Sequence, residues 1–186
     1  MDALSEPAPL PVEMSADGKH ATVPEGTIEL GLECPEGHLF RRKVQYSLVS
    51  VTLPSSLKRI GDRAFAGCYQ LALTSLPEGL TSIGDEAFYC CHSLALTSLP
   101  KGLKTIGNRA FRGCSSLALK ALPDGVTSID SQAFEGCTSL AVTSLPGGLV
   151  GVGEGAFRGC TSLATSLSLS SPQRRLLGYD SARWAP

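Results

Sequence analysis

Cysteine and histidine are the residues of this chain best suited to chemistry, and two places bring them close together. Cys34 and His38 lie four residues apart, and Cys90, Cys91 and His92 are consecutive. Thiolates and imidazoles are the usual ligands of Zn²⁺, and a cysteine beside a base can also act as a nucleophile. However, the separation of the two clusters matches no zinc module, and adjacent side chains on a turn point apart. We therefore expect no catalytic residue, no metal site and no cofactor.

The cysteines as a group indicate packing. The chain has seven, an odd number that excludes complete disulfide pairing within one chain. Five of them recur at intervals of 23 residues, which favours a column of small buried side chains over a disulfide framework. These five are Cys68, Cys91, Cys114, Cys137 and Cys160.

The elements that must position all these residues are repeats. A 23-residue sequence repeat begins at Leu53 and occurs in five consecutive copies. The clearest copy is LPEGLTSIGDEAFYCCHSLALTS, from Leu76 to Ser98. Identical residues at a fixed period predict identical side chains stacked coil upon coil, in a solenoid stabilised by its coil–coil interfaces. The phenylalanine column comprises Phe65, Phe88, Phe111, Phe134 and Phe157.

Each repeat also carries the signature of one helical turn. Asp62 and Asp85 follow a glycine and are preferred N-cap residues. Five residues further on stands a glycine, where a left-handed C-cap is expected. Cys90 replaces that glycine in one copy, so we expect a positive φ there with a strain of about 1 kcal/mol.

The repeat resembles leucine-rich repeats, and most closely the BspA-like, Treponema-type subclass. The matching residues are the run Ile83–Phe88, then Cys91, Leu94 and Leu99–Pro100, with counterparts in every copy between Leu48 and about Leu167. The resemblance implies an α/β repeat solenoid: an arc with a parallel β-sheet on one face and short helical turns on the other. It also implies roles in interaction and adhesion, and no catalytic activity.

One stretch departs from that subclass. The expected strand has apolar residues at Leu71, Leu73 and Leu76, with Thr74 in a position that is usually apolar. Lysine takes the Thr74 position in another copy and is almost never fully buried. The sequence therefore leaves two alternatives, of which we favour the first: burial of the Leu73 column with a local bulge, or an exposed apolar docking stripe. The column comprises Leu73, Leu96, Leu119 and Val142.

The chain divides into four parts. Residues 1–18 contain three prolines and predict a flexible segment. Residues 19–52 predict a degenerate first coil that caps the N-terminus, with a strand between Leu48 and Leu53. Residues 53–167 hold the five repeats, and residues 168–186 form a tail without a repeat. That tail is a poor polar cap, so we expect self-association through an uncapped C-terminal end as one way of binding.

Positions that vary while the core columns stay constant are the candidates for function. Tyr69 and His92 share one such position, and Tyr89 and Arg112 share another. These four could cluster across neighbouring coils, so we take them, with Leu73, Leu96 and Leu119, as the candidate partner-binding residues.

Composition narrows the class of partner. The net charge of −1 lacks the basic excess expected of a protein that binds nucleic acid or anionic lipid. No stretch reaches the ~20 apolar residues of a membrane-spanning helix. The N-terminus lacks a signal-peptide pattern, which favours an intracellular, cytoplasmic protein. We expect a non-enzymatic scaffold that binds another protein. The alternative is an adhesion module for matrix protein or carbohydrate, which would need export.

Overall fold

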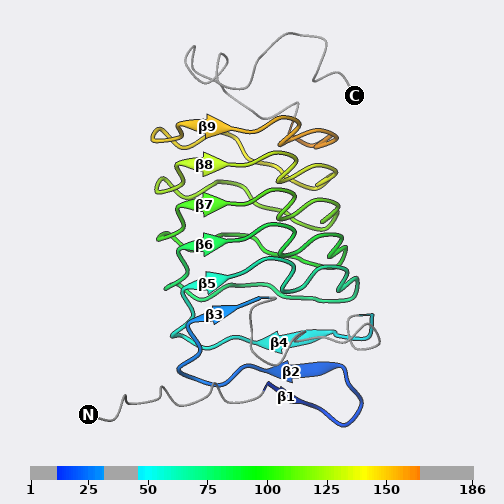
Figure 1. Cartoon of the computed structure of the whole chain (residues 1–186). Coiled ribbons are helices and arrows are strands. Elements are labelled where there is room, and N and C mark those ends of the chain that lie inside the picture. The colour runs from blue at the N-terminus through cyan, green and yellow to red at the C-terminus, as the bar shows by residue number, and fades with distance from the viewer. Residues whose placement is uncertain (1–11, 32–45, 164–186) are drawn as a thin grey trace, which may run out of the picture.

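A stack of short coils makes up the described chain. The computed structural model describes residues 12–31 and 46–163 of 186, and each successive coil adds one strand to a common wall (Figure 1). The strands of these ranges are β1 (Glu13–Met14), β2 (His20–Thr22), β3 (Glu29–Leu30), β4 (Ser50–Thr52), β5 (Arg59–Ile60), β6 (Ser82–Ile83), β7 (Thr105–Ile106), β8 (Ser128–Ile129) and β9 (Gly151–Val152). The predicted repeat solenoid with a parallel sheet is therefore confirmed.

Six strands form the parallel sheet, in the order β3-β5-β6-β7-β8-β9. Ile60 pairs with Ile83, so one step across the sheet equals one 23-residue repeat. In β5 to β8 the second residue is an isoleucine that points into the core, and the residue before it is polar. β3 and β9 carry Leu30 and the partly buried Val152 at the same position. A β-branched residue beside Ser or Thr suits such a half-buried strand.

The sheet does not run where we expected it. In the described repeats the stretch equivalent to Leu71–Leu76 contains no strand. Its coils are joined there by few backbone bonds, such as the one that Ala95 N donates to Leu73 O at 3.2 Å. The strand is instead the Ser/Thr–Ile pair that follows the next leucine, where both flanking N–H groups donate to the preceding coil.

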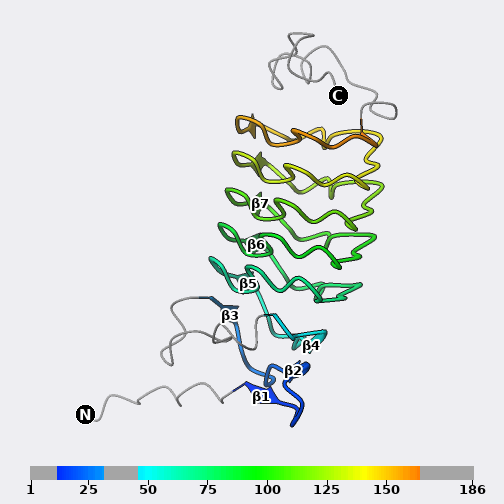
Figure 2. The ribbon, with the colours of Figure 1, turned by 90° about the vertical axis from the view of Figure 1, so that its right-hand side faces the viewer.

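The N-terminal end carries a second sheet, in the order β1-β2-β4. β4 falls within the stretch Leu48–Leu53, and the strand predicted there is confirmed. β1 runs antiparallel to β2 and closes this end of the stack (Figures 1 and 2). Of the segment predicted to be flexible, residues 1–11 lie outside the described residues.

The outer wall consists of turns, and the predicted helical turns are wrong. Ala66 N donates to Arg63 O at 3.2 Å, which is a bond within the coil. Phe65 N, by contrast, donates to Ala87 O of the following coil at 2.7 Å. Because the N–H groups alternate between the two directions, the continuous series of bonds that defines a helix does not form. No helix occurs in the ranges 12–31 and 46–163.

Two positions of each turn wall have a left-handed backbone. Cys90 has a φ of 57°, which confirms the positive φ predicted for it among the glycines of its column. The second position was not foreseen, because it carries ordinary side chains: Arg63, Glu86, Arg109 and Gln132 all have φ between 53° and 57°.

The two aspartates do not cap their own turns. Asp62 Oδ1 accepts a hydrogen bond from the backbone N–H of Asp85 at 2.9 Å, and Asp85 Oδ1 accepts one from Asn108 N at 2.8 Å. The expected N-cap is therefore replaced by a bond to the equivalent residue of the next coil. These carboxylates hold neighbouring coils together, which accounts for them without catalysis.

The core consists of the predicted columns. The phenylalanine rings stack face to face along the solenoid with centroids 5.2–5.4 Å apart. Beside them lie the buried alanine, isoleucine, leucine and cysteine columns. No polar or charged residue of the described ranges is buried, so burial of apolar surface supplies the driving force for stacking.

Candidate functional site

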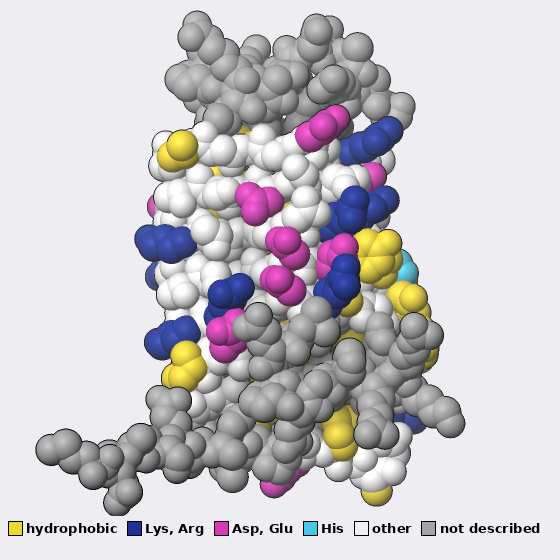
Figure 3. All heavy atoms as spheres, viewed as in Figure 1, with side chains coloured by type: hydrophobic (Ala, Val, Ile, Leu, Met, Phe, Trp, Pro, Cys, Tyr) yellow, Lys and Arg dark blue, Asp and Glu magenta, His cyan; other side chains and the backbone are white. Residues whose placement is uncertain are grey.

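The most unusual surface feature is a short column of stacked aromatic rings. Tyr46 and Tyr69 stack with their centroids 5.6 Å apart, and Tyr69 and His92 stack at 5.4 Å with 10° between the planes. All three side chains are exposed. Figure 3 shows apolar side chains gathered on this flank beside a histidine and basic residues. We call Tyr46, Tyr69 and His92 the aromatic column.

Backbone geometry explains why these side chains face outward. Tyr69 N donates to Gly67 O and His92 N donates to Cys90 O, both at 2.9 Å. In each coil the left-handed residue therefore reverses the chain two residues before the column. In the coils above His92 the same position carries hydroxyl residues, which are Ser115, Thr138 and Thr161.

The His92 ring is fixed by a second contact. Its Nδ1 lies 2.8 Å from Gly113 O. A carbonyl oxygen can only accept, so Nδ1 must carry the proton and Nε2 is the nitrogen that a partner can meet. The stack and this bond together hold the ring in one orientation.

A second pair lies next to the column, three residues earlier in each coil. The Arg112 guanidinium sits over the Tyr89 ring at 5.9 Å from its centroid, within the range of a cation–π contact. Arg112 Nε also pairs with Glu135 Oε2 at 3.1 Å. Electrostatic interaction with the neighbouring Cys90 side chain, and then hydrogen bonding to it, raises the pKa of the Tyr89 phenol. Tyr89 is therefore a neutral hydrogen-bond donor at physiological pH.

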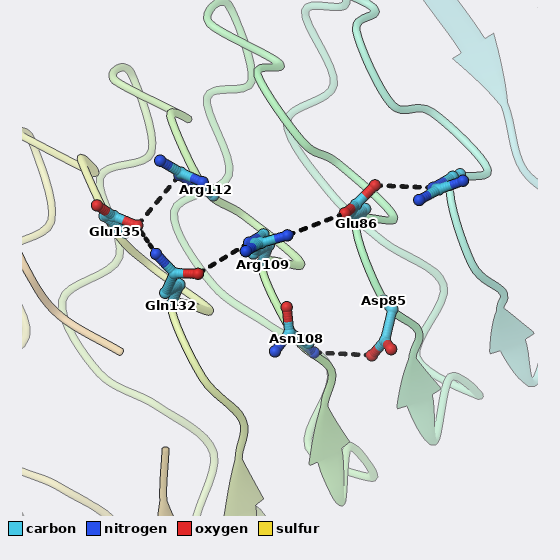
Figure 4. A network of polar contacts seen from close by, with 8 residues as sticks. Asp85, Glu86, Asn108, Arg109, Arg112, Gln132 and Glu135 are labelled. Atoms are coloured by element: carbon cyan, nitrogen blue, oxygen red, sulfur yellow. Dashed lines mark hydrogen bonds and ion pairs between the residues drawn. The ribbon is translucent and has the colours of Figure 1, made fainter. Parts of the chain in front are cut away.

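A polar ladder borders this surface (Figure 4). Glu86 pairs with Arg63 at 2.7 Å and with Arg109 at 3.5 Å, and Arg109 Nε donates to Gln132 Oε1 at 2.8 Å. Hydrogen bonding to Glu86 raises the pKa of Arg63. Gln132 then donates to Glu135, the partner of Arg112. Three arginines and two glutamates of the ladder largely balance one another, which leaves the aromatic column as the distinctive chemistry.

The structure brings together four of the predicted partner-binding residues in two pairs. Tyr69 contacts His92, and Tyr89 contacts Arg112, in both cases from neighbouring coils. Tyr46 was missed, although a signal was present: it lies 23 residues before Tyr69 and so continues the same column upstream of the clear repeats.

The other three predicted residues are not an exposed stripe. Leu96 and Leu119 have no exposed surface, and Leu73 is half-buried against the core. The alternative of an exposed apolar docking stripe is therefore wrong, and the predicted burial of the Leu73 column is confirmed. Two consecutive exposed residues, Thr97 and Ser98, precede the next buried leucine, but this stretch forms no strand, so the expected β-bulge does not occur there.

The cysteine column is inert packing, as predicted. Each thiol from Cys91 onward donates to a phenylalanine carbonyl at 3.0–3.1 Å. Burial raises the pKa of Cys68 and of Cys160 to about 12, and the pKa of Cys91 well above its ordinary value. Cys91 faces inward while its neighbour His92 faces outward, so the two side chains form no catalytic pair.

No group of three or more potential metal ligands occurs among the described residues, and no helix among them could span a membrane. Cys34 and His38 lie outside the described residues.

The chain is similar to known repeat proteins. Residues 39–170 match the BspA type leucine rich repeat region, in six copies. A leucine rich repeat protein from T. pallidum is 26% identical, with a TM-score of 0.51 and coverage of 91% of this chain and 93% of that one. A leucine rich cell surface protein from Faecalibacterium prausnitzii is 25% identical, with a TM-score of 0.49 and coverage of 82% and 51%. A leucine-rich repeat protein from Eubacterium ventriosum is 19% identical, with a TM-score of 0.51 and coverage of 84% and 47%.

This chain therefore spans about half the length of the last two proteins. No curated protein is significantly similar in sequence. The match to the family model extends over well more than half of the chain and includes the run Ile83–Phe88 that suggested the resemblance. The chain belongs to the BspA type leucine rich repeat family.

Proposed function

We propose that this protein is a non-catalytic scaffold that binds another protein through the aromatic column and the adjoining Tyr89–Arg112 pair. The observation that carries the proposal is the stack Tyr46–Tyr69–His92, which is exposed yet held in place. Tyrosine and arginine are enriched among the few residues that supply most of the energy of protein–protein binding.

The geometry supports tight binding because the cost of ordering is small. Each ring already contacts its neighbour in the column, and His92 is fixed further by Gly113 O. Side chains that are immobile before binding lose little conformational entropy when a partner arrives. The largely balanced charges of the neighbouring ladder favour a partner surface without strong net charge.

The orientation of the rings favours a protein over a carbohydrate as the ligand. A sugar packs its C–H groups against an open aromatic face, but here Tyr69 has a ring stacked on each side, and Tyr46 and His92 each turn one face toward Tyr69 at centroid distances of 5.4–5.6 Å. The column therefore presents mainly ring edges, with hydroxyl groups and the His92 Nε2. Such edges suit the hydrogen-bonding groups of a protein surface.

The test uses replacements that the fold already contains. A partner is first identified by crosslinking and mass spectrometry with the full chain, and its Kd is then measured for Tyr69→Ser and His92→Thr. Serine and threonine occupy the same position in later coils, so both variants should fold as the wild type does. We expect each to raise the Kd at least about tenfold.

Thr97→Ala is the matched control, because Thr97 is exposed but belongs to the stretch that follows the column. We expect it to leave the Kd unchanged. Equal binding by the wild type and Tyr69→Ser would refute the proposed surface, and the absence of any reproducible partner would refute the function itself.

A further inference from the structure

The aromatic column ends at His92, although its position continues through the later coils. Ser115, Thr138 and Thr161 occupy that position there. Their hydroxyl groups turn back to the preceding coil: Ser115 Oγ donates to His92 O at 3.5 Å, and Thr138 Oγ1 donates to Ser115 O at 3.4 Å. A hydroxyl group is much smaller than a ring. The face of the exposed His92 ring that points away from Tyr69 therefore lacks the ring that covers the corresponding face of Tyr69.

The backbone at Ser115 is the same as at the residues that carry rings. Ser115 N donates to the carbonyl two residues before it at 2.9 Å, and Tyr69 N and His92 N do the same. A ring at the level of Ser115 would therefore lie over His92 as His92 lies over Tyr69, with centroids 5.4 Å apart and 10° between the planes. That separation falls within the range of about 4.5–7 Å in which aromatic pairs attract each other.

The neighbouring position shows a ring that the chain itself covers. Arg112 comes from the same coil as Ser115, and its guanidinium lies over the Tyr89 ring of the preceding coil, 5.9 Å from the centroid. His92 belongs to the same coil as Tyr89 but has only the Ser115 hydroxyl group in the coil that follows. The His92 ring is also fixed, since its Nδ1 lies 2.8 Å from Gly113 O. A ring that is held in place and keeps one face open is a preorganised platform for stacking.

We propose that an aromatic side chain of the partner protein stacks on His92 beside Ser115 and continues the aromatic column by one ring. The inference rests on the proposed function, because it names the group of the partner that the column receives. Aromatic residues are frequent hot spots of binding, and they tend to pair with hot spots on the other protein. A nucleobase has a similar face, but a net charge of −1 provides little attraction for the phosphates that accompany it.

Ser115→Tyr tests the proposal by filling the position with a ring of the chain itself. Tyrosine occurs at the same position as Tyr69, so the variant should fold, and its urea midpoint should be no lower than that of the wild type. With the partner identified by crosslinking, we expect the Kd to rise at least about tenfold. Thr138→Tyr is the matched control, because it adds the same ring one coil further on and leaves the His92 face open. Its Kd should stay within about twofold of the wild type.

A second measurement identifies the partner's ring. Each Phe, Tyr and Trp in the crosslinked segment of the partner is replaced by alanine. One replacement should raise the Kd at least about tenfold with the wild type but less than about twofold with Ser115→Tyr, because that variant has already displaced the ring. The absence of such coupling would overturn the proposal.

The outcomes separate this inference from the function on which it rests. A Kd that Tyr69→Ser raises but Ser115→Tyr leaves unchanged would overturn the stacking on His92 and leave the proposed binding surface intact. Equal weakening by Ser115→Tyr and Thr138→Tyr would indicate general steric obstruction and would also overturn the inference. A Kd that Tyr69→Ser leaves unchanged would refute the proposed surface itself.

Discussion

Replacement of Cys90 by glycine is expected to stabilise this protein, although it removes a side chain. Cys90 has a φ of 57° where its neighbours in the column, Gly67 and Gly113, have 73° and 77°. A left-handed backbone costs a residue with a side chain about 1–2 kcal/mol. Glycine avoids that cost but gains about 0.5–1 kcal/mol of conformational freedom in the unfolded chain. The net gain is therefore about 0.5–1 kcal/mol in the free energy of unfolding.

The assay is urea unfolding of the wild type, Cys90→Gly and Cys90→Ala. Alanine also removes the thiol but keeps the Cβ and its strain, so the difference between the two variants isolates the backbone effect. We expect Cys90→Gly to be the more stable by roughly 1 kcal/mol, with an unchanged m-value.

The reverse change provides an internal check. Gly113→Ala should lower the free energy of unfolding by about 1 kcal/mol. The alanine would have to adopt the positive φ of Gly113, and its Cβ would lie 3.2 Å from Cys90 Sγ. If Cys90→Gly proved no more stable than Cys90→Ala, the strain argument for the whole column would be refuted.

Three further predictions concern the core and the cysteines. Phe111→Ala should cost about 3–5 kcal/mol in urea unfolding, since the ring is fully buried between Phe88 and Phe134, and a loss below about 1 kcal/mol would contradict the stacked core. Because burial raises the folded-state pKa of the column thiols, the unfolded state loses protons first as the pH rises. The contribution of these thiols to the free energy of unfolding should therefore be constant below about pH 8 and fall above about pH 9, by up to about 1.4 kcal/mol per pH unit for each thiol. Native protein at pH 8 should expose Cys90 alone, among the described thiols, to a thiol reagent.

Much of the fold could be predicted because the same core residues recur at the same positions in every repeat. A period of 23 residues with constant Phe, Ile and Cys positions requires stacked coils, and the parallel register Ile60–Ile83 follows from it directly. The positive φ of Cys90 was predictable as well, because its column is otherwise glycine.

The failures arise from contacts between coils, which a single repeat does not reveal. Asp85 after a glycine has the sequence of an N-cap, but its carboxylate bonds to Asn108 N of the next coil. The helical turn fails for the same reason, since Phe65 N finds its acceptor one coil away. Local propensity was overridden wherever a neighbouring coil offered a partner.

The candidate site was predictable in part. Tyr69, Tyr89, His92 and Arg112 stood out as variable residues among constant columns, but the pairing of rings required the coil spacing. The left-handed position of Arg63 and its equivalents left one trace in the sequence. Gly155 occupies it in the fifth repeat, with a φ of 65°.

The opposed hydrogen bonds of the two walls have an electrostatic consequence. In an α-helix all peptide dipoles point the same way and add up to partial charges at the ends. Here the N–H groups that flank the strands, such as Thr81 N, point to the preceding coil, while those of the turn wall, such as Phe65 N, point to the following coil. The two sets of dipoles oppose each other along the axis. Each added coil therefore lengthens the stack without building up charge at its ends, and repeats can be added or removed at little electrostatic cost.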